Sequence, residues 1–231
     1  MAWPQDLVRL QEIDHELEEI AERLDDITRR LQDNSEVREA QAMLKRSIQV
    51  MERAQKTQKD IEFKLQQVET KLERSRQRLY GGKVRNPREL ADLQAEAKSL
   101  RERKIILEDT LLEAMIAREE AEATQAAAQE SMAAAQTAWE ATQQSLEAER
   151  DQLLAHRRDL QEERDALRAG IPKSALESYE YLWPRTGGTP VSSLRGDICG
   201  LCGVKVLRAT CIKVEKEEEA YCDGCRRLLV A

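Results

Sequence analysis

The stretch YGGKVRNPREL, residues 80–90, predicts the point at which the chain reverses direction. Its two glycines allow the left-handed conformation that ends a helix. Asn86 can cap a new helix, with Pro87 at the first helical position and Glu89 placed to complete a capping box. Because these stop and start signals lie so close together, we expect a tight turn at 80–88 between two helices. One unbroken helix is the alternative, and both Gly81-Gly82 and Asn86-Pro87 disfavour it.

Apolar residues on both sides of this turn recur at alternating steps of three and four, the spacing of a coiled coil. A first seam runs through Leu10, Ile13, Leu17, Ile20, Leu24, Ile27 and Leu31, and a later one through Leu90, Leu93, Ala97, Leu100 and on to Leu167. At QDNSEV, residues 32–37, the seam slips, which predicts a bend or short break because Asp, Asn and Ser favour caps and turns. Counting outward from the turn places residues opposite each other when their numbers add to about 168.

Composition supports this fold class and suggests two domains. The chain is 35% charged and only 3% aromatic, a profile typical of long solvated helices. Residues 171–231 nevertheless contain all five cysteines and four of the eight aromatic residues. We therefore predict a mainly α protein: a long antiparallel two-helix coiled-coil hairpin over residues 1–170, followed by a short helix and a small β zinc ribbon over residues 171–231.

Charge and hydropathy limit the cellular compartment and the binding partners that we expect for the protein. Residues 1–170 carry 28 basic and 36 acidic side chains, whereas residues 171–231 carry 9 and 8. This acidity argues against nonspecific coating of DNA or membranes. We also find no leader-like segment and no apolar run of the roughly 18–20 residues that span a bilayer. The expectation is a cytoplasmic protein without a membrane partner, in which thiols stay reduced.

Two Cys-x-x-Cys pairs near the C-terminus predict a metal site. Nineteen residues separate Cys199-Gly-Leu-Cys202 from Cys222-Asp-Gly-Cys225, a spacing typical of four-thiolate zinc sites. A complete protein shell makes the zinc structural, and its binding energy would add to the stability of a domain with few large apolar residues. The segment between the pairs, rich in Val, Ile and Thr, favours short antiparallel strands. Cys211 is expected to be a buried strand residue, with a reserve ligand as the alternative.

A cluster of basic residues at the turn is a candidate binding surface, which we call the basic tip. No acidic residue interrupts its six members, Arg74, Arg76, Arg78, Lys83, Arg85 and Arg88. Such a cluster suits an acidic protein or a phosphate backbone. A solvated turn with basic residues near a helix C-terminus is the plainer interpretation. Arg226 and Arg227, beside the last cysteine, are the other candidate partner-binding residues.

The chain resembles a bacterial family of four-cysteine zinc-ribbon proteins with a long N-terminal coiled-coil hairpin. The resemblance rests on YGGKVRNPRELADLQAEAKSL at the turn, IPKSALESYEYL after the coil, and CGLCG with CDGCRRLL at the end. Family members usually end in a Cys-Gly-Arg run, whereas Arg226 follows Cys225 directly in this chain. Some members are associated with flagellar gene control, through an alternative sigma factor or messenger RNA, and others with secretion. The resemblance therefore implies an adaptor or regulator.

These features bear on three classes of function. The first is a non-enzymatic adaptor or regulator in which the hairpin and the zinc ribbon bind proteins. The second is an RNA-binding or DNA-binding regulator, which is disfavoured because residues 197–231 carry six basic and six acidic side chains. The third is an enzyme, which we do not expect, because a two-helix coil offers no cleft and the only histidines are His15 and His156.

Overall fold

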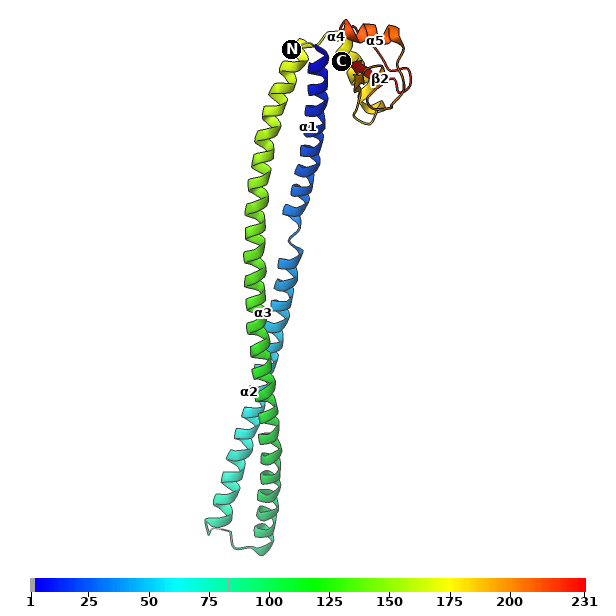
Figure 1. Ribbon diagram of the computed structural model, residues 1–231. Coiled ribbons are helices and arrows are strands. Elements are labelled where there is room, and N and C mark those ends of the chain that lie inside the picture. The colour runs from blue at the N-terminus through cyan, green and yellow to red at the C-terminus, as the bar shows by residue number, and fades with distance from the viewer. Residues whose placement is uncertain (1–2, 83) are drawn as a thin grey trace. The chain divides into compact units, whose positions relative to one another are not determined.

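The computed structural model describes residues 3–82 and 84–231 (Figure 1). Its elements are α1 (Trp3–Gln32), α2 (Ser35–Tyr80), α3 (Pro87–Gly170), α4 (Lys173–Leu182), the 3-10 turn η1 (Trp183–Arg185), β1 (Val191–Arg195), β2 (Ile198–Cys199), α5 (Arg208–Glu215) and β3 (Leu228–Val230). The predicted fold class is confirmed: a long helical hairpin precedes a small C-terminal sheet. Among the described residues, no helix has the length and apolar character needed to cross a bilayer.

The turn forms where the Gly-Gly and Asn-Pro signals predict it. Gly82 adopts a φ of 69°, the left-handed conformation that follows the end of α2. Asn86 caps α3, because its Oδ1 accepts a hydrogen bond of 3.0 Å from the backbone N–H of Arg88. Glu89, expected to complete a capping box, forms an ion pair of 3.1 Å with Arg78 across the turn.

The predicted break in the first helix is confirmed at Asp33 and Asn34, which separate α1 from α2. The chain forms two compact units that divide at this break: one combines Met1–Asp33 with Gln143–Ala231, and the other is Asn34–Thr142. The first unit therefore contains α1, the C-terminal part of α3 and the cysteine-containing domain. The second contains α2 and the rest of α3. The domain boundary predicted near residue 170 stays a prediction.

Each unit has antiparallel helix packing, but the predicted register is wrong by about one helical turn. In the first unit, Arg9 pairs with Glu163 and Arg23 with Glu149, so the paired numbers add to 172 instead of 168. In the second unit, Glu69 pairs with Lys104. The offset is already present in this last pair, which lies between the turn and the break at Asp33 and Asn34, so the break does not cause it.

The C-terminal domain has a small sheet in the order β2-β1-β3. Strand β1 pairs antiparallel with β2 and parallel with β3. The core beneath it joins Tyr179 of α4 and Leu228 of β3 to Leu7 and Leu10 of α1, and both of these leucines are 0% exposed. The N-terminal helix thus completes the core of the C-terminal domain.

The segment between the cysteine pairs corrects one prediction, because residues 208–215 form helix α5 and not a strand. Leu207 is extended just before the helix, and Glu217 follows it with a φ of 59°. Within α5, Cys211 and Val214 lie three residues apart and are both buried. Their burial on one helical face outweighs the strand preference of the Val, Ile and Thr residues, because such preferences depend on packing.

Candidate metal centre

The four predicted cysteine ligands meet at one point of the C-terminal domain. The Sγ atoms of Cys199, Cys202, Cys222 and Cys225 all lie within 4.8 Å of one another. Cys199 Sγ is 3.8 Å from Cys225 Sγ, and Cys202 Sγ is 3.6 Å from Cys222 Sγ. Cys199 and Cys222 are buried, whereas Cys202 is exposed. The cluster can therefore hold a single metal ion near the surface of the domain.

Two loops of equivalent geometry, here called the first and second knuckles, carry these thiols. In the first, the N–H of Gly203 donates to the carbonyl of Cys199 at 3.0 Å; in the second, the N–H of Arg226 donates to the carbonyl of Cys222 at 2.9 Å. The residue after the second cysteine has a positive φ in both loops, 71° at Gly203 and 62° at Arg226. A left-handed conformation that glycine adopts in the first knuckle is thus adopted by arginine in the second.

Hydrogen bonds favour the thiolate form at two of the four sulfurs, Cys199 and Cys225. At Cys202, a backbone hydrogen bond from Val204 is outweighed by desolvation and by bonds to the neighbouring sulfurs, which raise its pKa to about 12. Burial alone would raise the pKa of Cys199, but hydrogen bonds from the backbone of Cys202 and the side chain of Ser192 lower it to about 6. The Ser192 hydroxyl lies 3.2 Å from Cys199 Sγ. At Cys225, burial is likewise opposed, and the backbone amide and guanidinium of Arg227 lower the pKa. Because metals bind the thiolate, the contacts at Cys199 and Cys225 favour cation binding at these two sulfurs.

The fifth cysteine lies outside this cluster. Cys211 is buried in α5, with its Sγ 3.9 Å from the carbonyl oxygen of Val206. Its burial agrees with the prediction, although it belongs to a helix and not to a strand. It packs with Val206, Val214 and Ala220 beside the buried cysteines. The residue therefore acts as a small apolar side chain in the core next to the cluster.

The two arginines after Cys225 have different environments. Arg226 is exposed and lines a surface groove of about 800 Å³ between α4 and the second knuckle. Arg227 is half-buried, and its guanidinium donates to the backbone carbonyls of Thr189 at 2.7 Å and Thr186 at 3.2 Å. Arg227 therefore fastens the loop before β1, which leaves Arg226 as the better placed of the two for a partner.

The basic tip is exposed, but one of its members is already paired. The ion pair with Glu89 neutralises part of the charge of Arg78. Lys83 lies outside the described residues. The other four members are all exposed side chains: Arg74, Arg76, Arg85 and Arg88.

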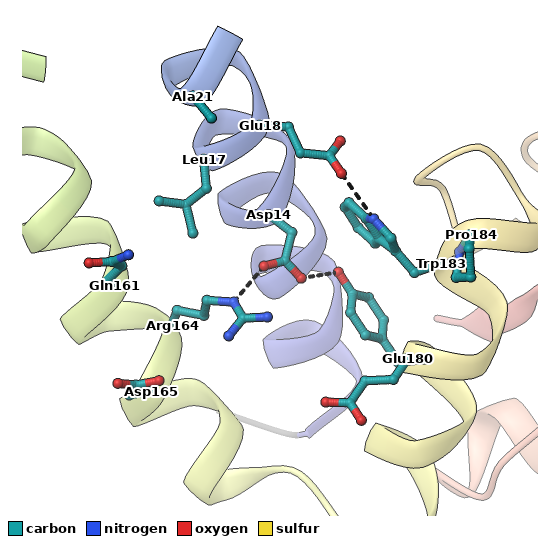
Figure 2. A pocket seen from close by; sticks show the side chains of 11 residues that line it. Asp14, Leu17, Glu18, Ala21, Gln161, Arg164, Asp165, Glu180, Trp183 and Pro184 are labelled. Carbon is teal, nitrogen blue, oxygen red and sulfur yellow. Dashed lines mark hydrogen bonds and ion pairs between the residues drawn. The ribbon is translucent and has the colours of Figure 1, made fainter. Parts of the chain in front are cut away.

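A buried polar network, not predicted from the sequence, joins three helices of the first unit. Asp14 of α1 is 9% exposed, and its carboxylate accepts hydrogen bonds from Arg164 of α3 at 2.6 Å and from the hydroxyl of Tyr179 of α4 at 2.7 Å (Figure 2). Trp183 packs against Tyr179 and donates its indole N–H to Glu18 at 3.1 Å. The network ties the C-terminal domain to the end of the hairpin.

This network predicts a loss of stability at alkaline pH. Burial and the bond to Asp14 raise the pKa of Tyr179 far above its usual value. In the unfolded chain the Tyr179 hydroxyl ionises near pH 10. The stabilisation that this hydroxyl provides is therefore complete below about pH 10 and is lost as the pH rises further. We expect the free energy of unfolding to fall more steeply between about pH 10 and 11 in the wild type than in Tyr179→Phe. Urea titrations across this range test the prediction, and parallel curves would contradict it.

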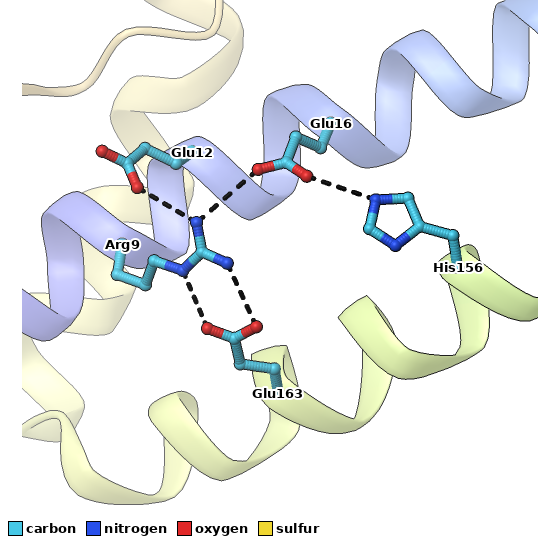
Figure 3. A network of polar contacts seen from close by, with 5 residues as sticks. All are labelled: Arg9, Glu12, Glu16, His156 and Glu163. Carbon is cyan, nitrogen blue, oxygen red and sulfur yellow. Dashed lines mark hydrogen bonds and ion pairs between the residues drawn. The ribbon is translucent and has the colours of Figure 1, made fainter.

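Exposed ion pairs form a second network nearby. Arg9 contacts Glu12, Glu16 and Glu163, and His156 lies 3.5 Å from the Glu16 carboxylate (Figure 3). His15 instead packs against Trp183, with ring centroids 5.2 Å apart. The two histidines therefore have separate packing and ion-pair contacts.

The fold and the site together define a class: a helical-hairpin protein whose C-terminal domain carries a four-cysteine cluster. Residues 10–187 match the family described as the CT398-like coiled coil hairpin domain. The chain belongs to this family.

Known proteins with similar sequences and structures agree with this assignment. The chain is 28% identical over 147 residues to the uncharacterised protein Rv2229c of Mycobacterium tuberculosis, a match that covers 62% of this chain and only 59% of that protein. The structure of CT398 from Chlamydia trachomatis has a TM-score of 0.70 at 17% identity, covering 99% of this chain and 97% of that one. A structure from Mycobacterium smegmatis has a TM-score of 0.65 at 24% identity, covering 100% and 99%. These two structures are similar to this chain in fold.

Proposed function

We propose that the four cysteines bind one structural Zn²⁺, and that the protein is a non-enzymatic cytoplasmic adaptor or regulator that binds another protein through its C-terminal domain. In a tetrahedral site with Zn–S bonds of about 2.3 Å, neighbouring sulfurs lie about 3.8 Å apart. Two of the six sulfur–sulfur separations, 3.6 Å and 3.8 Å, fit this value, and all six lie within 4.8 Å. Four thiolates complete the shell and leave no position for a reacting water, which supports a structural ion.

The backbone of Arg226 is the observation that carries the adaptor proposal. Its left-handed conformation costs a non-glycine residue about 1–2 kcal/mol, and Gly203 occupies the equivalent position of the first knuckle. An exposed arginine kept at this energetic cost supports a binding role, because backbone strain often accompanies functional sites. Its guanidinium suits an acidic side chain or a terminal carboxylate of a protein partner.

The groove beside Arg226 has the composition of a protein-binding surface. It is lined by Tyr181, Tyr221 and Arg185 among others, and Arg185 lies 3.7 Å from the centre of the Tyr181 ring. Tyrosine and arginine are enriched among the residues that dominate binding energy. The resemblance to flagellar and secretion regulators extends the proposal to an alternative sigma factor or a secretion component as the partner.

Arg226→Gly tests the proposal because its two expected effects have opposite signs. Removing the strain should raise the free energy of unfolding by about 1 kcal/mol, measured in urea. The same change should abolish capture of the protein partner from a native cytoplasmic extract. Arg195→Ala, at another exposed basic residue of the domain, is the matched control and should leave capture intact. A stabilised Arg226→Gly variant that captures the same proteins would disprove the role of Arg226.

The second candidate function is nucleic-acid binding, which the four exposed arginines of the basic tip favour. In that case nuclease treatment of the extract should remove the captured partners. Replacement of Lys83, Arg85 and Arg88 by glutamine should then reduce the slope of log affinity against log salt by roughly two to three units. An unchanged slope would leave the basic tip as a solvated turn.

A further inference from the structure

A groove lies in the first compact unit where α1, α3 and the segment formed by α4 and η1 meet, next to the buried Asp14 network (Figure 2). Its volume is about 760 Å³, within the roughly 300–1,000 Å³ that is typical of ligand sites. Leu17, Ala21 and Pro184 form apolar parts of its wall. Of the described residues that line it, none belongs to the cysteine cluster or to the groove beside Arg226. It is therefore a separate surface feature of this unit.

Carboxylates dominate the polar lining of this groove, which we therefore call the acidic groove. Four carboxylates and one guanidinium line it, a net charge of −3: Asp14, Glu18, Asp165, Glu180 and Arg164. Asp14 pairs with Arg164 at 2.6 Å. Glu180 pairs with Arg168, which lies just outside the lining, at 2.5 Å. Glu18 and Asp165 form no ion pair with any residue that the structure describes, so their charges remain available to a ligand.

The charged residues beside the lining do not cancel this excess. Six charged residues of α1 and α3 lie one helical turn from a lining residue, three basic and three acidic: Arg157, Arg158, Arg168, Glu22, Asp25 and Glu162. On α4, Glu177 is in the same position, and it is paired with Lys173 at 3.7 Å. Positive and negative neighbours are thus equal in number, and the groove keeps its negative charge. It therefore attracts a cationic ligand.

An aromatic ring lies beside one of the two available carboxylates. Trp183 is half-buried and lines the acidic groove, and its indole N–H donates to Glu18 at 3.1 Å (Figure 2). A guanidinium stacks on aromatic rings through its flat face and binds carboxylates through its N–H groups, so it suits this pair. The ammonium of lysine is more strongly hydrated and lacks the planar fork. The protein already contains such a stack, because Arg185 lies 3.7 Å from the centre of the Tyr181 ring.

We propose that the acidic groove binds an arginine side chain of a protein partner, with the guanidinium against Trp183 and Glu18 and with Asp165 of α3 on the other wall. The groove is larger than a single arginine side chain and is partly apolar. Apolar residues next to the arginine in the partner therefore contact Leu17 and Pro184. The occupant is thus a short protein segment with an arginine between apolar residues.

Helix α4 contributes side chains to two grooves of opposite charge. Tyr179 and Glu180 line the acidic groove, whereas Ser178 and Tyr181 line the groove beside Arg226. Two arginines and one carboxylate line that second groove, which gives it a net positive charge. The two grooves therefore accept different protein segments. The acidic groove can bind its arginine whether or not Arg226 binds a partner.

Two tripeptides that differ in charge test the proposal on the full-length protein. Acetyl-Leu-Arg-Leu-amide carries the guanidinium, and its counterpart with citrulline has a neutral urea of similar shape. At low salt, we expect the arginine peptide to bind with a dissociation constant on the order of 1 mM, and the citrulline peptide to bind about 10-fold more weakly. Ligand-observed NMR titrations measure both constants. Equal binding of the two peptides, or no binding of the arginine peptide at about 20 mM, overturns the proposal.

Substitutions in the lining test whether the arginine peptide binds in the acidic groove. Glu18→Gln and Asp165→Asn should each raise its dissociation constant by on the order of 10-fold, because each removes a charged acceptor. Asp159→Asn is the matched control, since Asp159 is exposed and lies at least about 120° around α3 from every lining residue of that helix. The control should change the constant by less than about twofold. Far-ultraviolet dichroism identical to that of the wild type verifies the fold of all three variants.

Two results of these titrations would assign the binding to a different cause. An equal effect of Asp159→Asn and Asp165→Asn would mean that the general acidity of the hairpin attracts the peptide. Tighter binding of spermidine than of the arginine peptide, with the same dependence on Glu18 and Asp165, would assign the groove to a polyamine. Either result overturns the proposal of a protein segment as the occupant.

Discussion

Cys222→Ser should abolish binding of the proposed Zn²⁺ and unfold the C-terminal domain while the hairpin stays helical. Cys222 is 0% exposed and lies in the cluster with Cys199 and Leu229, so the change removes a ligand and leaves a polar hydroxyl in the core. Structural zinc binding is worth about 10–16 kcal/mol in small peptides, comparable to or greater than the roughly 5–15 kcal/mol stability of whole domains. We expect the metal content to fall from one ion per chain to none, by elemental analysis. Near-ultraviolet dichroism should be lost with little change at 222 nm.

Cys211→Ala is the matched control for this prediction. Both cysteines are buried in the same apolar cluster, but only Cys222 belongs to the group of four sulfurs. The control should retain one ion per chain and lose at most about 1–2 kcal/mol of stability from the small cavity. Loss of metal in Cys211→Ala would refute the ligand set. Retention of metal in Cys222→Ser would have the same consequence.

The elements that the sequence predicts correctly are those specified by local chemistry. The hairpin turn follows from Gly-Gly and Asn-Pro, and Asn86 forms the cap expected of it. The break at Asp33 and Asn34 follows from the slip in the heptads. The cysteine cluster follows from two spacings of Cys-x-x-Cys, because each pair needs only a tight turn to present both thiols. These features depend on neighbouring residues alone, so a single sequence is sufficient to predict them.

The features that sequence reasoning missed depend on contacts between distant residues. Strand propensity failed at α5 because the buried face of that helix packs against core residues elsewhere in the domain, among them Ala220 and Leu229. Arg227 looks like a surface arginine in the sequence, but carbonyls some forty residues earlier accept its hydrogen bonds. Asp14 lies on a helix whose sequence is typical of a solvated helix. The two hydrogen-bond partners of Asp14 lie 150 and 165 residues away in the sequence. Nothing in a single sequence connects such pairs.

Asp14→Ala should destabilise the first compact unit by about 3 kcal/mol, because breaking a buried ion pair leaves its partners unsatisfied. Arg164 and the hydroxyl of Tyr179 both lose their acceptor, and Tyr179 is only 1% exposed. We place the effect at the lower end of the range for such pairs because Arg164 is partly exposed and is screened by solvent. Urea unfolding followed by the fluorescence of Trp183, which packs against Tyr179, measures the loss.

The exposed network on the same helix provides a matched comparison. Glu163 bonds the Arg9 guanidinium through both carboxylate oxygens, at 2.8 Å and 3.1 Å, but neither side chain is buried. Glu163→Ala should therefore cost less than about 1 kcal/mol, as exposed ion pairs usually do. If Asp14→Ala costs no more than Glu163→Ala, the buried network does not stabilise the attachment of the C-terminal domain. A larger loss of stability in Asp14→Ala should become smaller when Arg164→Met and Tyr179→Phe are added to the same variant. These apolar replacements leave no charge or hydroxyl buried without a bond, so this result would assign the lost stability to the unsatisfied partners of Asp14.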